Sequence, residues 1–96
     1  MIKITKDNNK IVISGHAGNN EYGKDIVCAS ISSIVYTTIN AIEKIRLGSI
    51  EVIDKDDMQI NILTDDEMVN LLIENMFDLF NEIAKTYPKN VSVKES

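Results

Sequence analysis

The stretch DIVCASISSIVYTTINAIEKIRL, residues 25–47, decides the fold of this 96-residue chain. Its apolar residues recur at the three- and four-residue spacing of one helix face, at Val27, Ile31, Ile34, Val35, Ala41, Ile42 and Ile45. Lys44 and Arg46 stand in the last turn, and Gly48 follows as a stop signal. Because many of these residues are β-branched, packing must stabilise the helix more than propensity does. The stretch therefore predicts a long core helix from Asp25 to Leu47.

The segments on either side of this helix alternate apolar with polar residues, as half-buried strands do. Turn-forming residues interrupt the alternation at Asp7–Asn9 and at Lys55–Asp56. The pattern predicts two hairpins, Ile2–Thr5 with Lys10–Ser14 and Ile50–Asp54 with Met58–Leu63. The acidic residues around the second turn are most simply a solvated loop.

A second helix is predicted after the second hairpin. Thr64-Asp65-Asp66-Glu67 has the spacing of a capping box, with acidic residues at the positive end of the helix dipole. Pro88 closes the helix, and a short last strand follows at Val91–Val93. The predicted core stripe consists of Val69, Leu72, Met76, Leu79, Phe80, Ile83 and Tyr87.

The predicted element order is ββαββαβ. It indicates an α+β fold of two layers, a mainly antiparallel sheet covered by two helices. A chain of 96 residues supplies one core, so residues 1–96 are expected to form a single domain. The order of the strands in the sheet does not follow from these local patterns.

The composition excludes some functions. Hydrophobic residues make up 44% of the chain and charged residues 26%, as in ordinary globular domains. The net charge of −5 argues against direct binding of nucleic acid. Uninterrupted apolar runs are much shorter than a bilayer span, and no export signal is visible. We therefore expect no membrane partner and a cytoplasmic location.

The only histidine and the only cysteine, His16 and Cys28, stand on either side of a glycine-rich loop. Gly15 ends a predicted strand, so His16 emerges where that strand gives way to the loop. Asp25 is a good N-cap, which places Cys28 in the first turn of a helix, where the dipole favours a thiolate. An imidazole within hydrogen-bond reach would activate this thiol and carry its proton to a leaving amine.

The loop itself, Ala17–Lys24, is polar and contains Gly18 and Gly23, with Tyr22 as its main apolar anchor. A loop of this composition is expected to order over a bound peptide, and a plain connector is the alternative. The glycines match no nucleotide-binding fingerprint. One histidine and one cysteine do not furnish a structural zinc site by themselves, so we expect no metal and no organic cofactor.

Structural roles for the same residues stay open at this point. A lone cysteine in a small domain is usually a buried apolar residue, and spacing does not show that Cys28 and His16 meet. Asp25 either caps the helix or orients His16 as a third group. Ser32, one turn after Cys28, either enters the site or bonds to a carbonyl of its own helix.

Gly15-His16-Ala17, Gly23, Asp25-Ile26-Val27-Cys28-Ala29 and Ser32 together resemble the signature of the ribosomal-processing cysteine protease family, called Prp. The resemblance implies a cytoplasmic, homodimeric bacterial endopeptidase that works without a cofactor. Its substrate would be a large-subunit ribosomal protein, number twenty-seven, from which it removes an N-terminal extension with bulky apolar residues before the cut. The resemblance makes Cys28 the nucleophile and His16 the general base, with supporting roles for Asp25, Ala29 and Ser32.

Two other functions fit the same residues. One is a non-enzymatic, ribosome-associated binding module in which Cys28 and His16 only pack. The other is a different thiol-dependent hydrolase or acyl transferase. A homodimer is also expected, because the second helix has apolar residues outside its core stripe that either cover a second sheet face or meet a partner chain: Met68, Leu71, Ile73 and Phe77.

Overall fold

A computed structural model describes residues 1–15 and 24–96, with side chains from Ile26 onward in the second part. The elements in these ranges are β1 (Ile2–Asp7), β2 (Lys10–Ser14), α1 (Lys24–Ile45), β3 (Ile50–Asp54), β4 (Met58–Ile62), α2 (Glu67–Thr86) and β5 (Val91–Glu95). The predicted order ββαββαβ is confirmed. Most boundaries agree with the prediction within one or two residues, which is the usual uncertainty of an element end.

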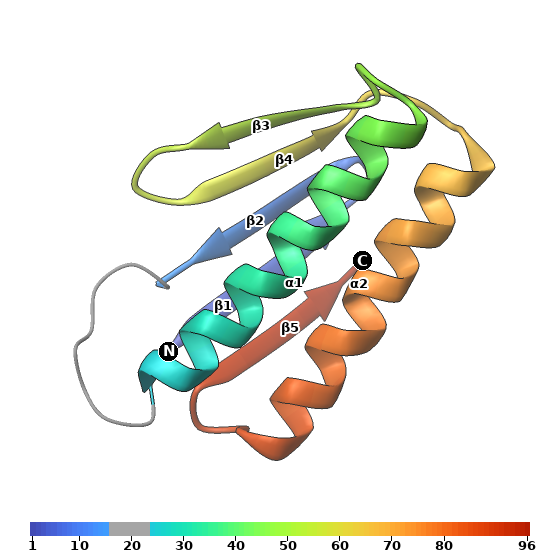
Figure 1. Ribbon diagram of the computed structural model, residues 1–96. Coiled ribbons are helices and arrows are strands. Elements are labelled where there is room, and N and C mark those ends of the chain that lie inside the picture. Colours follow the sequence, from blue (N-terminus) through green and yellow to red (C-terminus); the bar gives the residue numbers. More distant parts are fainter. Residues whose placement is uncertain (16–23) are drawn as a thin grey trace.

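The strands form a mixed five-stranded sheet in the order β3-β4-β2-β1-β5. All neighbouring pairs are antiparallel except β1 with β5, which is parallel. Both helices lie on the same face of this sheet (Figure 1). The predicted α+β fold of two layers is therefore confirmed. The strand order adds what the local patterns left open, since it places β1 between β2 and β5.

The core lies between the helices and one face of the sheet. The register sets Ile4 opposite both Ile13 and Val93, and Ile11 opposite Ile60, so alternate strand residues gather on the helix side. From α1 the core receives Val27, Ile31, Val35 and Ile42, all of them predicted. Ile45 was also expected there, but it is 36% exposed because α1 ends at this residue.

The predicted core stripe of α2 is wrong at four residues. Ile73 and Phe77, expected outside the core stripe, are only 4% and 2% exposed. Leu79 and Tyr87, expected in the core, are 42% and 41% exposed. Phe77 packs edge-on against Phe80, with ring centroids 5.3 Å apart. Apolar residues occupy much of the circumference of α2, so their spacing allows more than one stripe, and the contact with the sheet decides between them.

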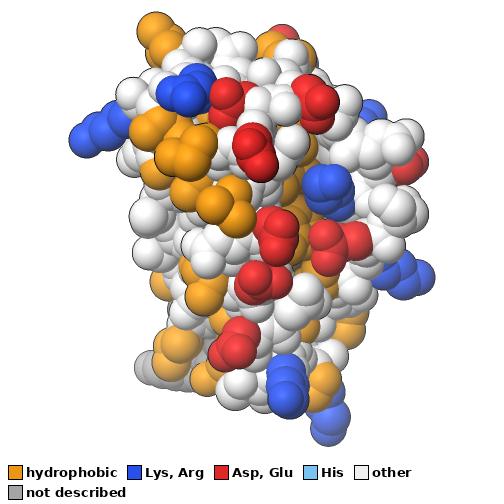
Figure 2. Space-filling model, turned by 90° about the vertical axis from the view of Figure 1, so that its right-hand side faces the viewer, with side chains coloured by type: hydrophobic (Ala, Val, Ile, Leu, Met, Phe, Trp, Pro, Cys, Tyr) orange, Lys and Arg blue, Asp and Glu red, His pale blue; other side chains and the backbone are white. Residues whose placement is uncertain are grey.

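The outer side of α2 combines apolar and acidic side chains. Met68 and Leu71 are 50% and 59% exposed, as their predicted surface position requires. Figure 2 shows the side of the molecule on which α2 lies, with carboxylates next to exposed apolar groups. The exposed carboxylates of α2 are Glu67, Glu74, Asp78 and Glu82. Of the proposed dimer surface, only Met68 and Leu71 therefore remain available.

The N-cap of α2 is Asp66, whose carboxylate accepts from the backbone N–H groups of Met68 at 2.9 Å and Val69 at 3.1 Å. The predicted capping box is displaced, because Thr64 Oγ1 accepts instead from the N–H of Asp66 at 3.2 Å. Arg46 Nε donates to Asp66 Oδ2 at 2.9 Å. This bond to Arg46 is the main reason why the pKa of Asp66 is lowered. It also ties the end of α1 to the start of α2.

The segment Ile26–Ile45 of α1 is long and apolar enough, by length and composition, to cross a membrane. This corrects the sequence-based argument, which considered only uninterrupted apolar runs. The helix is nevertheless two-sided. Its buried residues Val27, Ile31 and Val35 face the core, and its opposite side exposes Ser33, Thr37, Asn40 and Lys44. A core helix has such a polar side, whereas a lone spanning helix is apolar all round.

Candidate active site

Cys28 is the fifth residue of α1 and is half-buried, partly packed against the core. Because α1 begins at Lys24, Asp25 lies within the first turn and not in the predicted capping position before it. Helical side chains lean toward the N-terminus, so the thiol lies over the first turn, whose N–H groups lack partners within the helix. The dipole acts chiefly within that turn, so its effect on Cys28 is smaller than at the predicted third position.

The start of α1 and the end of β2 lie at the same end of the molecule (Figure 1). Gly15, which follows β2, has a φ of +80°, a left-handed conformation that favours glycine. A Cβ at this position would collide with the carbonyl oxygen of Met1, the residue before β1. Only glycine therefore fits here without strain. β2 thus ends at the end of the molecule where α1 begins (Figure 1).

Several predicted site residues lie outside the described part of the chain: His16, Gly18, Tyr22, Gly23 and the side chain of Asp25. The approach of His16 to Cys28, and the ordering of the loop over a peptide, therefore stay predictions. Ala29 is exposed beside Cys28, and Ser32 is half-buried one turn further along α1. The described part of the chain thus brings Cys28, Ala29 and Ser32 together on one helical segment.

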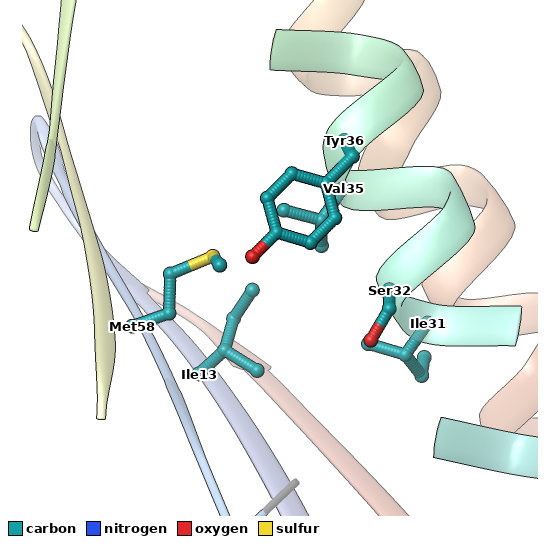
Figure 3. Close-up of a pocket in the computed structure, with 6 residues that line it drawn as sticks. All are labelled: Ile13, Ile31, Ser32, Val35, Tyr36 and Met58. Carbon is teal, nitrogen blue, oxygen red and sulfur yellow. The ribbon is translucent and has the colours of Figure 1, made fainter. Parts of the chain in front are cut away.

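Beyond Cys28, α1 and the sheet leave a shallow hollow that is open to solvent, with about 10 Å³ of space, roughly enough for one water molecule (Figure 3). Its lining is apolar apart from two hydroxyl groups: Ile13 from β2, Met58 from β4, and Ile31, Ser32, Val35 and Tyr36 from α1. The ring of Tyr36 extends from α1 toward Met58. Ile31 and Val35 follow Cys28 by three and seven residues, so the hollow lies on the same side of α1 as the cysteine.

The hydroxyl of Tyr36 donates to Asp54 Oδ2 at 3.1 Å. The pKa of Tyr36 is raised, first by desolvation and then by the hydrogen bond and the negative charge of Asp54. The sequence suggested no role for Tyr36. Asp54 is the last residue of β3, as the predicted strand Ile50–Asp54 requires, although it was also counted among the acidic residues of a solvated turn. Spacing gave no signal for Tyr36, because it follows Cys28 by eight residues and is therefore turned by about 80° around the helix.

Within residues 1–15 and 24–96, no three His, Cys, Asp or Glu side chains are grouped closely enough to hold a metal ion. The chemistry that the described residues offer is therefore that of a partly exposed thiol at a helix start, next to an apolar hollow.

Comparison with known proteins gives a consistent result. The sequence profile described as "Cysteine protease Prp" matches residues 1–92. The ribosomal processing cysteine protease Prp of Mycoplasma genitalium is 30% identical over 95 residues, which cover 99% of this chain and 96% of that protein. The protein of the same name from Staphylococcus aureus is 27% identical over 85 residues, which cover 84% and 80% of the two chains.

Solved structures show the same fold. The crystal structure of SMU.848 from Streptococcus mutans superposes with a TM-score of 0.84 at 27% identity, over 98% of this chain and 90% of that one. The ribosomal processing protease Prp of S. aureus, crystallised with a substrate peptide, gives a TM-score of 0.85 at 23% identity, over 99% and 97% of the two chains. Since the profile match spans nearly all of the sequence, this chain belongs to the cysteine protease Prp family.

Proposed function

We propose that this chain is an endopeptidase that removes the N-terminal extension of large-subunit ribosomal protein number twenty-seven, with Cys28 as nucleophile and His16 as general base. The observation that carries the proposal is the place of Cys28. It is the chain's one thiol, and it lies half-buried at the start of α1 in a member of a cysteine protease family. The homologous S. aureus enzyme has been crystallised with a substrate peptide and with a covalently linked product peptide.

The proposed reaction has two stages. In the first, the Cys28 proton passes to His16 while the sulfur attacks the scissile carbonyl carbon. The C–N bond then breaks, His16 gives its proton to the departing amine, and a thioester remains on Cys28. In the second, water attacks the thioester while His16 takes its proton, and the C–S bond breaks to release the acid. Backbone N–H groups in the first turn of α1, which have no acceptor within the helix, would stabilise the oxyanion in both stages.

The setting of the proposed enzyme follows from its substrate. A protease that processes a ribosomal protein before assembly acts in the cytoplasm. We extend the proposal to a homodimer, in which the exposed side of α2 around Met68 and Leu71 would meet a second copy. Sedimentation at micromolar concentration tests this part, and a monomer mass would contradict it.

The proteolytic proposal is tested by incubating the protein with the extended ribosomal protein and measuring the product masses. The unaltered protein should release the extension as a separate peptide. Cys28→Ala should lower the rate by more than about a thousandfold, because no other side chain replaces the nucleophile. Its stability should change by less than about 1 kcal/mol, since Cys28 is only half-buried.

Ser30→Ala is the matched control, because Ser30 also lies near the start of α1 and bonds only to its own helix, from Oγ to the carbonyl oxygen of Ile26 at 2.9 Å. This variant should cleave at nearly the normal rate. Near-normal cleavage by Cys28→Ala would refute the role of the thiol. Binding of the precursor without any cleavage by the unaltered protein would favour the binding module.

A further inference from the structure

β5 is an edge strand with an unpaired outer side. The sheet ends at β5, whose only neighbour among the described strands is β1. Just after β5, the N–H of Ser96 donates to the carbonyl of Lys6 on β1 at 3.0 Å. Because backbone groups alternate in direction along a strand, those of Val93 and Glu95 point away from β1. Within residues 1–15 and 24–96, no residue supplies a hydrogen-bond partner for these outward groups.

A groove with about 280 Å³ of space lies between α2 and this edge. It is lined by residues of three elements: Asn70, Ile73, Glu74 and Phe77 of α2, Lys6 of β1 and Glu95 of β5. Figure 2 shows a narrow strip of apolar surface flanked by acidic side chains on this side of the molecule. Ile73 and Phe77 are only 4% and 2% exposed, so the groove offers little apolar area. Its main binding groups are therefore the charged side chains and the free backbone of β5.

An extended peptide fits an unpaired edge beside such a groove. A strand added to β5 would exchange backbone hydrogen bonds with Val93 and Glu95, as in other proteins that bind a peptide at a sheet edge. Alternate side chains of the added strand would point to the helix side of the sheet and lie in the groove. The backbone bonds give affinity for any extended chain, and the groove chooses among side chains.

The charges around the groove favour a basic peptide. Glu74 and Glu95 line it, against Lys6 as the one positive lining residue. Glu67 and Asp78 lie on the same side of α2, because they are turned from Glu74 by only about 20° and 40° around the helix. A lysine or arginine of the added strand would meet these carboxylates, whereas an acidic residue would be repelled.

We propose that the groove between α2 and β5 binds an extended, basic segment of the ribosomal protein substrate, which joins the sheet beside β5. Proteins that bind RNA carry many lysines and arginines, so a ribosomal protein supplies such a segment outside the bond that is cleaved. β5 starts at Val91, opposite Ile2, at the end of the molecule where α1 begins (Figure 1). A substrate chain that leaves Cys28 can therefore continue along β5. This inference rests on the proposed function, because it takes the substrate to be a ribosomal protein.

The first test measures peptide binding to the full chain carrying Cys28→Ala, which cannot cleave. The probe is a fluorescein-labelled heptapeptide of alternating Thr and Lys, followed by fluorescence anisotropy. It should bind about tenfold more tightly than the heptapeptide of alternating Thr and Glu, because of the carboxylates around the groove. Methylation of its inner backbone nitrogens should weaken binding by a similar factor, about tenfold, because it removes the donors that a strand needs.

Variants of the groove locate the peptide. Glu95→Pro removes an outward N–H that the ladder with β1 does not use, so the sheet should form while the Thr-Lys peptide loses about tenfold in affinity. Val52→Pro is the matched control on the other edge strand, β3. Ser49 accepts from the N–H of Leu63, which follows β4, so by alternation the N–H of Val52 also points away from its neighbour. Val52→Pro should leave the affinity unchanged.

Charge variants give a test that does not depend on proline. Glu74→Lys should weaken the Thr-Lys peptide about tenfold, and Glu95→Gln should weaken it by a smaller factor. Asp56→Lys is the matched control, because it makes the same charge change at an exposed residue of the turn between β3 and β4. These surface residues are exposed, so the variants should fold and decide the matter even if Glu95→Pro does not.

The second test connects the groove to cleavage. With Cys28 present, Glu95→Pro and Glu74→Lys should lower kcat/KM for the extended ribosomal protein about tenfold, mainly through KM. A short peptide that spans only the cleavage site does not reach the groove, so its kcat/KM should stay within about twofold of that of the unaltered protein.

The outcomes distinguish this inference from the proposed function. Unchanged kcat/KM for the ribosomal protein in Glu95→Pro and Glu74→Lys would overturn the role of the groove and leave the protease intact. A monomer mass for Glu95→Pro beside a dimer of the unaltered protein, with unchanged kinetics, would show that a second copy occupies the edge and would also overturn it. If the unaltered protein cleaves no substrate, the proposed function fails. The heptapeptides then decide the groove alone, and equal affinity for the Lys and Glu peptides refutes it.

Discussion

Substitution of Gly15 by alanine tests whether the exit of the chain from β2 needs glycine. Gly15 and Gly48 have almost the same backbone conformation, with φ of +80° and +84°. A Cβ at Gly48 would meet nothing within 4 Å, whereas a Cβ at Gly15 would overlap the Met1 carbonyl oxygen. Gly48→Ala therefore measures the cost of the left-handed conformation alone, and Gly15→Ala measures that cost together with the collision.

The magnitudes follow from these two terms. The left-handed conformation costs an alanine about 1–2 kcal/mol at either position. The collision adds about 1–3 kcal/mol at Gly15, as in other overpacked sites. Movement of Met1 is restricted, because the next residue, Ile2, is 6% exposed and donates its N–H to the carbonyl of Asn90 at 2.8 Å. Gly15→Ala should thus destabilise the domain by about 2–5 kcal/mol and Gly48→Ala by about 1–2 kcal/mol.

Urea unfolding of the three proteins measures this difference at equal m-values. Thermal unfolding gives a second measure, since each kcal/mol corresponds to about 4–8 °C in a domain of this size. Equal free energies of unfolding for the two variants would refute the reasoning, because they would show that Met1 moves aside without cost.

Three other predictions address the core, an ion pair and the proposed catalytic pair. Phe77→Ala should cost about 3–5 kcal/mol of unfolding free energy, and Leu79→Ala less than about 1 kcal/mol, because the first side chain is 2% exposed and the second 42%. A larger loss for Leu79→Ala than for Phe77→Ala would instead support the stripe expected from sequence. The pKa of Asp66 is lowered on folding, so its charge stabilises the fold above the unfolded pKa near 3.8, and this contribution is lost as the pH falls through the lower folded value. The urea midpoint of the unaltered protein should therefore decrease as the pH is lowered, and this decrease should be smaller in Asp66→Asn, which keeps the cap acceptor, and in Arg46→Gln. An equal decrease in the variants and the unaltered protein would contradict the assignment. His16→Ala should raise the pH midpoint of Cys28 alkylation by iodoacetamide, and an unchanged midpoint would show that the two side chains do not interact.

The element order was predictable because each element has a local signature. Alternation in the strands, the stop at Gly48 and the closure at Pro88 all lie in short windows of sequence. The core face of α2 was not predictable in the same way, because apolar residues such as Phe77 and Leu79 both fit a helical stripe. The contact with the sheet chooses between them, and that contact is not a local property. The same applies to Thr64 and Asp66, which are both good caps in one short run.

Single residues of the candidate site were predictable from the sequence, but the contacts between them were not. The cysteine at a helix start and the glycine at a strand end both follow from local patterns. Tyr36 and Asp54 are 18 residues apart, and their hydrogen bond depends on how α1 lies over β3. No local pattern carries that information. For the same reason, the sequence suggests that His16 and Cys28 act together but does not show that their side chains meet.

The parallel pairing of β5 with β1 has a consequence for folding kinetics. Its register joins Ile2 to Val91 and Lys6 to Glu95, so nearly the whole chain must close as a loop before this ladder forms. The two hairpins and both helices are local by comparison and can form first. Until β5 arrives, one edge of β1 is an unpaired template for strands of other molecules. Variants that weaken β5 should therefore aggregate during refolding in proportion to concentration, even when their final fold is intact.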